Sequence, residues 1–245
     1  MYLSFLLIDV GTNPDRPRPG RIWLRNRYRV HQRLCMAFPS ATRAAGDPQF
    51  LKPFKPDDFA AQQVHVARKA DAGFLFRVDP QLGGRVVILV QSALKPDWDY
   101  AFHNAGYLLA APPEAKPFDP DVAKGQKLRF RLVANPTRKI DTKSGPDGRR
   151  RNGKRVPVNY DELGEWLTRR AERGGFSVDE DSLAVQPGYV YVNKKRNGDG
   201  QRLRSARYDG VLEVTDPARF RETLGRGIGP GKGFGFGLLS VAPPR

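Results

Sequence analysis

The sequence predicts an α+β protein made of two tandem ferredoxin-like domains, each with the element order β-α-β-β-α-β. Strand-like and helix-like periodicities follow one another in that order in the first half of the chain and again in the second half. A proline-rich junction with Pro112, Pro113 and Pro117 separates the halves, and a glycine-rich loop precedes a last apolar strand. We therefore expect an N-terminal domain over residues 1–112 and a C-terminal domain over residues 113–245.

The first half begins with a strand and a helix. Residues 2–10 form an apolar, β-rich run that is typical of a buried strand, and the prolines in 11–20 indicate a loop. Asn26 is suited to cap a helix over residues 27–38, which Pro39 is expected to end. Four apolar residues share one face of this helix and are expected to enter the core: Val30, Leu34, Ala37 and Phe38.

A hairpin and a second helix complete the predicted first domain. Residues 40–72 show no clear pattern beyond a short helix near 57–68 and are expected to be mostly loop. Two strands, 73–78 and 85–91, follow across a glycine turn, and a helix over 100–109 leads to a return strand.

The second half repeats the pattern with a more basic surface. Between its first strand and its first helix, residues 135–155 are expected to be a basic loop. The elements expected are a strand over 127–133, a helix opened by Asn159 or Asp161 and running to Arg173, strands over 188–192 and 208–214 joined by a ribbon over 193–207, a helix from Asp216 and Pro217 to Leu224, and a last strand over 238–241.

Charge is the strongest property of the whole chain. It has 42 Lys and Arg against 26 Asp and Glu, a net charge of +16 and a pI near 10.3, which indicates a polyanionic partner, most commonly nucleic acid. A membrane surface is the alternative, but no basic amphipathic helix or lipidation signal is evident. The single cysteine, Cys35, excludes an internal disulfide and suits a reducing compartment. With no signal peptide and no apolar run of ~20 residues, we expect a soluble intracellular protein without a membrane partner.

The glycine-rich loop near the C-terminus predicts an anion-binding backbone. Its amides surround Lys232, and the loop fails the NTPase phosphate-loop pattern because Arg226 and Gly233 stand where Gly and Ser or Thr are needed. Residues 232–236 match the start of an RRM signature, but too little chain follows for a standard RRM. A turn that only lets the last strand enter the sheet is the alternative. The loop glycines are Gly227, Gly229, Gly231, Gly233, Gly235 and Gly237.

Two basic segments are the predicted phosphate contacts, namely the loop at 149–155 and the ribbon at 193–207. A double-stranded RNA stem is recognised mainly through its shape and backbone, so charge density there matters more than base-specific side chains. Solvated faces or protein-contact surfaces are the alternatives. The RNA-binding candidates are Arg149, Arg150, Arg151, Lys154, Arg155, Lys194, Lys195, Arg196, Arg202, Arg204 and Lys232.

The ordered set of motifs resembles the CasE family, the CRISPR repeat-processing endoribonucleases of type I-E systems. The resemblance spans nearly the whole chain and implies two ferredoxin-like domains, a CRISPR repeat RNA hairpin as partner, other Cascade subunits as further partners and a prokaryotic cytoplasm. One departure is Arg27, where many members have proline, and the proline-rich segment at 40–60 is unassigned. The motifs are Tyr28-x-x-His31, Leu89-Val-Gln-Ser92 with Pro96-Asp-Trp98, Leu128-Arg-Phe-Arg-Leu-x-Ala-Asn-Pro136, and Gly227-Ile-Gly-Pro-Gly-Lys232 with Gly237-Leu-Leu-Ser-Val241.

The resemblance implies metal-independent cleavage at the 3′ base of the repeat stem-loop, with the product held in Cascade. Taken from the helix alone, a surface histidine at the edge of the core is the simpler interpretation of His31. The resemblance instead makes His31 the general acid or base, with Tyr28 orienting the ribose or sharing proton transfer. Which of the two takes the 2′-hydroxyl proton stays open.

Other chemistries have weaker support. No histidine or cysteine pair has metal-ligand spacing, so no metal and no cofactor are expected. His65, His103 and Cys35 are expected to be structural or surface residues. A non-catalytic RNA-binding subunit of the same fold and a basic ribosome-associated protein remain as alternatives.

Overall fold

The computed structural model describes residues 1–13, 15, 17–48, 73–81, 84–140, 154–194 and 199–244. The chain divides into two compact units. The first holds Met1–Asp121, Tyr191–Gln201 and Lys232–Gly235, and the second holds Val122–Val190, Arg202–Gly231 and Phe236–Arg245. The chain thus contributes two segments from its C-terminal half to the first unit.

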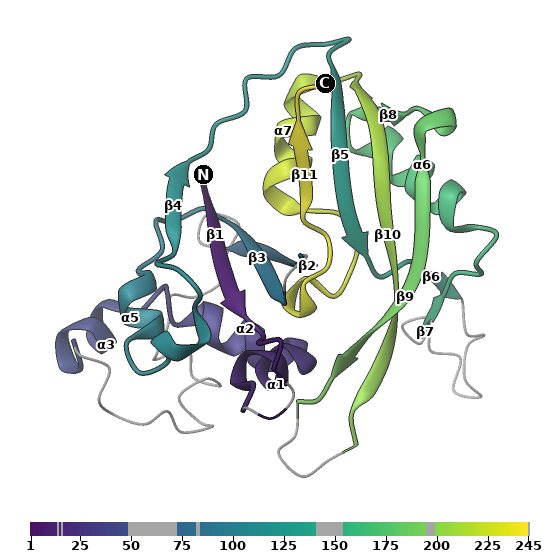
Figure 1. Cartoon of the computed structure of the whole chain (residues 1–245). Helices are drawn as coiled ribbons and strands as arrows, with labels where there is room; N and C mark the ends of the chain where they lie inside the picture. The colour runs from purple at the N-terminus through teal and green to yellow at the C-terminus, as the bar shows by residue number, and fades with distance from the viewer. Residues whose placement is uncertain are drawn as a thin grey trace, which may run out of the picture. The chain divides into compact units, whose positions relative to one another are not determined.

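The first unit contains an antiparallel sheet with the strand order β2-β3-β1-β4. The predicted strands at 2–10, 73–78 and 85–91 are confirmed within one or two residues at each end. The segment we assigned to the linker between the domains instead contains β4, which pairs with β1 (Figure 1). Pro117 ends this edge strand, where a residue without an N–H is tolerated. The strands are β1 (Tyr2–Asp9), β2 (Phe74–Pro80), β3 (Arg85–Ser92) and β4 (Glu114–Pro117).

Helices α2 and α5 of the first unit contribute buried side chains to the same core as this sheet. Two expectations were wrong: residues 19 and 20 begin a helix instead of ending a loop, and the helix expected over 100–109 is divided in two. Pro19 starts that unexpected helix because its fixed φ suits a first helical position. The helix predicted near 57–68 lies outside the described residues. The helices are α1 (Pro19–Arg25), α2 (Arg27–Cys35), α3 (Ala41–Gly46), α5 (Trp98–Phe102) and the short 3₁₀ helix η1 (Gly106–Leu108).

The core of the first unit confirms the apolar face predicted for α2. All four residues of this face are buried. The helix itself ends at Cys35 and not at Phe38, because the Met36 amide bonds back to the carbonyl of Arg33 in a tighter turn. The core includes Leu6, Ile8, Val30, Leu34, Ala37, Phe38, Phe76 and Ile88.

The second unit contains a sheet with the strand order β11-β5-β10-β8, and β9 adds to β10 (Figure 1). The strands predicted at 127–133, 188–192, 208–214 and 238–241 are confirmed, and β9 and β10 are longer than expected. The strands are β5 (Lys127–Ala134), β8 (Phe176–Val178), β9 (Ala184–Val192), β10 (Gln201–Val214) and β11 (Leu239–Ala242).

Two helices and an aromatic core stabilise this second sheet. The Asp216 carboxylate accepts bonds from the amides of Ala218 and Arg219, both at 3.1 Å, which confirms the predicted cap of the last helix.

No helix in the described ranges is long and apolar enough to cross a membrane. The remaining elements are α6 (Leu163–Arg173), α7 (Pro217–Arg226) and the 3₁₀ helices η2 (Glu180–Ser182) and η3 (Lys232–Phe234), of which η3 belongs to the first unit.

The basic segment 135–155, predicted to be a loop, is partly a two-stranded ribbon. Strand β6 (Thr137–Ile140) pairs with β7 (Lys154–Pro157), and residues 141–153 between them lie outside the described residues. The sequence did not predict these two strands, because both are rich in charged residues and neither shows a clean alternation of apolar and polar residues.

Candidate active site

Helix α2 presents Tyr28 and His31 at the edge of its buried face. Asn26 caps the helix, since its side-chain oxygen accepts a bond of 3.1 Å from the Tyr28 amide. Residues three apart are neighbours on a helix, and the ring centroids of Tyr28 and His31 lie 6.3 Å apart. Both side chains are half-buried, so the two rings lie side by side and remain accessible.

The His31 ring is held between aromatic and backbone groups of the first unit. Its centroid lies 5.6 Å from that of Phe74 and 6.3 Å from that of Phe76, both on β2. A Cβ added to Gly233 would come within 3.7 Å of the His31 Nε2 atom, so the glycine loop passes against the imidazole. The Cys35 Sγ atom lies 3.6 Å from the same nitrogen. These contacts fix the orientation of the ring and leave few ways for it to turn.

A lysine and a second aromatic ring extend the site beyond Tyr28. The ring of Phe234 lies 6.5 Å from that of Tyr28, edge to face, and the Lys194 Nζ atom lies 5.4 Å from the Phe234 centroid. The Asn26 side chain also bonds Asn193, donating to its carbonyl at 2.8 Å and accepting from its amide at 3.0 Å. The helix cap therefore also fixes the backbone next to Lys194.

Arg27 begins α2 and carries a buried charge beside this site. Among the described atoms its Nη1 has no hydrogen-bond partner. Burial lowers the pKa of Arg27 to about 10, and the nearby Asp79 opposes that shift. The guanidinium is therefore still protonated at neutral pH and adds to the positive charge of the first unit.

The side chains gathered here are of the types that proton transfer uses. An imidazole and a phenol, each able to give or take a proton, lie 6.3 Å apart, and Lys194 adds positive charge at the neighbouring ring of Phe234. Among the described residues, no three His, Cys, Asp or Glu side chains lie together as metal ligands would.

Comparison with known proteins shows what kind of protein carries this site. The model of a family described as CRISPR associated protein matches residues 1–243. The CRISPR-associated endoribonuclease Cse3 of Thermus thermophilus is 38% identical over 192 residues, which cover 73% of this chain and 85% of the relative. The chain belongs to the Cse3/CasE family of CRISPR-associated endoribonucleases.

Other Cse3/CasE proteins agree over the full length. The Cascade subunit CasE of Escherichia coli K12 is 27% identical over 249 residues, covering 99% of this chain and 100% of the relative. A structure of Cse3 bound to a 19-nucleotide RNA superposes with a TM-score of 0.69 at 32% identity, covering 99% of this chain and 100% of that one. A structure of Thermus thermophilus Cse3 with an RNA representing a pre-cleavage complex gives a TM-score of 0.68 at 31% identity, covering 99% and 98%.

The predicted RNA-binding residues of this family member are distributed over both units. Lys194 and Lys232 belong to the first unit, and the others that the structure describes belong to the second. Lys154 and Arg155 are exposed on β7, and Arg202 and Arg204 lie on β10. Arg149, Arg150, Arg151, Lys195 and Arg196 lie outside the described residues.

The glycines of the C-terminal loop have structural reasons of their own. Gly235 has a φ of +83°, and a Cβ there would lie 3.0 Å from the Phe76 ring. The Gly237 amide donates to the Val133 carbonyl at 2.8 Å, and the Gly235 amide donates toward the Lys232 carbonyl at 3.3 Å. These amides are occupied within the protein, which favours the close-packing interpretation at Gly235 and Gly237. The anion-binding role predicted for the loop as a whole stays a prediction. The loop glycines with positive φ are Gly227, Gly229, Gly231, Gly235 and Gly237.

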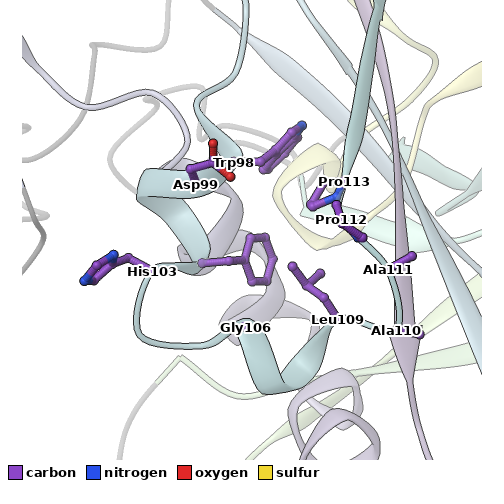
Figure 2. Close-up of a pocket in the computed structure, with 10 residues that line it drawn as sticks. Trp98, Asp99, His103, Gly106, Leu109, Ala110, Ala111, Pro112 and Pro113 are labelled. Carbon is purple, nitrogen blue, oxygen red and sulfur yellow. The ribbon is translucent and has the colours of Figure 1, made fainter.

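A hollow of about 540 Å³ in the first unit does not contain the predicted site residues (Figure 2). Trp98, Leu109, Pro112 and Pro113 give it mainly apolar walls. His103 is exposed, and in Figure 2 its imidazole points away from the other labelled side chains. This hollow therefore lacks the paired proton-transfer groups that α2 presents.

Helix α6 carries a group of arginines that the sequence pattern did not predict as a site. Arg170 and Arg173 line a hollow of about 340 Å³ in the second unit, next to the end of α7. Burial and the neighbouring charges of Arg173, Arg155 and Arg169 lower the pKa of Arg170. The helical positions of these arginines were visible in the sequence, but nothing there showed that β7 brings Arg155 close to them.

Proposed function

We propose that the chain is a metal-independent endoribonuclease that cleaves CRISPR precursor RNA at the 3′ base of the repeat stem-loop. The observation that carries this proposal is the Tyr28–His31 pair, two proton-transfer side chains with centroids 6.3 Å apart, in a chain 38% identical to the endoribonuclease Cse3. The high positive charge and the RNA-bound structures of similar Cse3 proteins support RNA as the substrate.

The reaction we propose uses the 2′-hydroxyl of the RNA itself. The 2′-oxygen attacks the adjacent phosphorus, the bond from phosphorus to the 5′-oxygen breaks, and the products are a 2′,3′-cyclic phosphate and a 5′-hydroxyl. One proton leaves the 2′-oxygen and another reaches the departing 5′-oxygen, so the step needs a base and an acid but no oxidant or added water. Positioned proton transfer of this kind typically contributes about 10²–10⁴ in rate.

His31 and Tyr28 divide these two proton transfers between them. The contacts of His31 with Phe74, Phe76 and Gly233 hold the imidazole in place, which a general acid or base requires. The cationic Lys194 offsets the charge that develops on the phosphate oxygens, and Lys232 belongs to the loop that passes the imidazole.

We further propose that both sheets are ferredoxin-like. The two strand orders support this, since β1 lies between β3 and β4 in the first sheet and β5 lies between β10 and β11 in the second, with β9 paired to β10 outside that order. Because β4 pairs with β1, the first domain extends past the boundary expected at residue 112 and includes Pro117. The product is expected to stay bound, and the protein to act as a Cascade subunit in a prokaryotic cytoplasm. The relative CasE, named as a Cascade subunit, supports that setting.

Incubation of the protein with an end-labelled repeat hairpin in EDTA tests this function. The wild-type chain should cut once at the base of the stem, and His31→Ala should bind within a few-fold of wild type and leave the RNA intact. His103→Ala is the matched control, because this histidine is exposed and lies at the C-terminal end of α5, away from α2 in the sequence. Tight binding without cleavage by the wild-type chain would favour the non-catalytic RNA-binding alternative.

A further inference from the structure

Two exposed tyrosines form a fixed pair in the second unit. Tyr160 precedes α6, and Tyr189 lies on β9, and their side chains are 50% and 53% exposed. Their hydroxyl oxygens lie 2.8 Å apart, a hydrogen bond in which either group donates. A surface hydrogen bond of this kind adds little to folding stability, so two large aromatic rings are kept in solvent for little gain in folding free energy.

Each ring of the pair has an arginine beside it. The Arg202 Cζ atom lies 5.2 Å from the Tyr189 centroid, and the Arg204 Cζ atom lies 5.2 Å from the Tyr160 centroid. Both arginines belong to β10, where residues two apart point to the same face. The hydrogen bond to Tyr160 and the charges of Arg204 and Arg202 lower the pKa of Tyr189.

Further bonds hold this cluster in place. The Asn135 side chain donates to the Arg204 carbonyl at 2.5 Å, and the Arg204 guanidinium lies 3.5 Å from the carbonyl of Val158. Each tyrosine ring is thus restrained in the free protein by a neighbouring arginine and by the hydrogen bond to the other tyrosine. Pre-ordering of this kind lowers the entropy that a ligand loses to the site when it binds.

The chemistry of the cluster matches unpaired nucleotides. Bases stack on exposed aromatic rings, and arginines contact both the rings and the phosphates of the strand. A base-paired stem conceals its base faces within the helix, whereas unpaired nucleotides present theirs. Tyr160 and Tyr189 are each about half exposed, so each keeps surface that a base can contact beside its arginine.

We propose that Tyr160 and Tyr189, flanked by Arg202 and Arg204, form a stacking subsite for one or two unpaired RNA nucleotides next to the repeat stem. This subsite rests on the proposed function, because it takes RNA as the ligand. It differs from the phosphate contacts predicted from charge, since here the aromatic rings provide the affinity and the arginines hold them.

The test compares two RNAs in binding assays with the His31→Ala protein, so that cleavage plays no part. One RNA is the repeat stem-loop alone, and the other carries its natural single-stranded flanks. Alanine at both Tyr160 and Tyr189 should weaken binding of the flanked RNA by roughly 5- to 100-fold and that of the bare stem-loop by less than about two-fold.

Two further variants separate stacking from other effects. Phenylalanine at Tyr160 and Tyr189 keeps both ring faces, so it should bind the flanked RNA as the parent protein does. Tyr107→Ala is the matched control, a tyrosine 69% exposed in the first unit. A fluorescent 2-aminopurine in the flank should be quenched by the parent protein and not by the double alanine variant.

Three outcomes would overturn the subsite: equal weakening of both RNAs, unchanged binding in the double alanine variant, or unchanged 2-aminopurine fluorescence on binding. Failure of the proposed function would look different. It would be a wild-type chain that leaves the hairpin uncut, or that binds unrelated hairpins as tightly as the repeat.

Discussion

Replacement of Asn26 should weaken both the fold and the active site, because one side chain makes three bonds there. It accepts from the Tyr28 amide at 3.1 Å and exchanges two bonds with the Asn193 backbone, at 2.8 and 3.0 Å. Loss of a helix cap costs about 1 kcal/mol, and a typical intramolecular hydrogen bond contributes about 1 kcal/mol. Asn26→Ala should therefore destabilise the chain by about 2–3 kcal/mol.

A serine at the same position divides this cost into its parts. Asn26→Ser keeps a capping oxygen for the helix and loses the bonds to Asn193, so it should cost about 1–2 kcal/mol. Urea unfolding of wild type, Asn26→Ser and Asn26→Ala measures both differences. If the serine variant unfolds at the wild-type midpoint, the bonds to Asn193 contribute nothing and the argument for this connection is wrong.

The same variants report on catalysis. Because Asn26 fixes the backbone beside Lys194 and starts the helix that carries Tyr28, its loss should lower the single-turnover cleavage rate more than RNA affinity. A variant that loses stability but cleaves at the wild-type rate would show that the cap supports the fold alone.

Three further predictions concern the second sheet and the basic surface. Gly237→Ala should cost more than about 2 kcal/mol in urea unfolding, because φ is +90° and the new Cβ would lie 2.7 Å from a backbone carbonyl oxygen. The control Gly164→Ala, in helix α6 with open space around its Cβ, should not destabilise the chain and should add up to about 1 kcal/mol of stability. Burial raises the pKa of Tyr208, so this phenol contributes stability that is present below its ordinary pKa of about 10 and is lost as the pH rises above it. In Tyr208→Phe the free energy of unfolding should therefore fall less steeply between neutral and alkaline pH than in wild type. An equally steep fall in both proteins would contradict this. Lys194→Ala should reduce the slope of log RNA affinity against log salt concentration by about one, because one phosphate contact is lost, whereas the control Lys124→Ala should leave the slope unchanged. An unchanged slope in the Lys194 variant would show that Lys194 does not contact the RNA backbone.

Local signals in the sequence predicted the elements that depend on neighbouring residues. Asp216 and Pro217 gave the start of α7, because a capping carboxylate and a proline at the first turn act within one helical turn. The spacing of Tyr28 and His31 placed both on one side of α2 for the same reason. A return strand was expected after the helix at 100–109, but its place at β4 was not, because the prolines around β4 indicate a linker and its pairing with β1 is non-local.

The surroundings of the site could not be predicted, because they come from distant parts of the chain. Gly233 reaches the His31 ring from two hundred residues away, and Asn193 reaches the Asn26 cap across 167. No periodicity or motif encodes such contacts. The Tyr160–Tyr189 pair was missed for a related reason, since each tyrosine is unremarkable in its own segment and only the fold joins their hydroxyls.

A repeat hairpin with one 2′-deoxy nucleotide immediately 5′ of the mapped scissile phosphate tests directly whether the 2′-hydroxyl is the nucleophile. If His31 and Tyr28 act on the 2′-hydroxyl, the wild-type chain should bind this RNA with its usual affinity and leave it uncut in EDTA, while the all-ribose hairpin yields a 2′,3′-cyclic phosphate. Cleavage of the deoxy-substituted hairpin at the same bond would contradict the account.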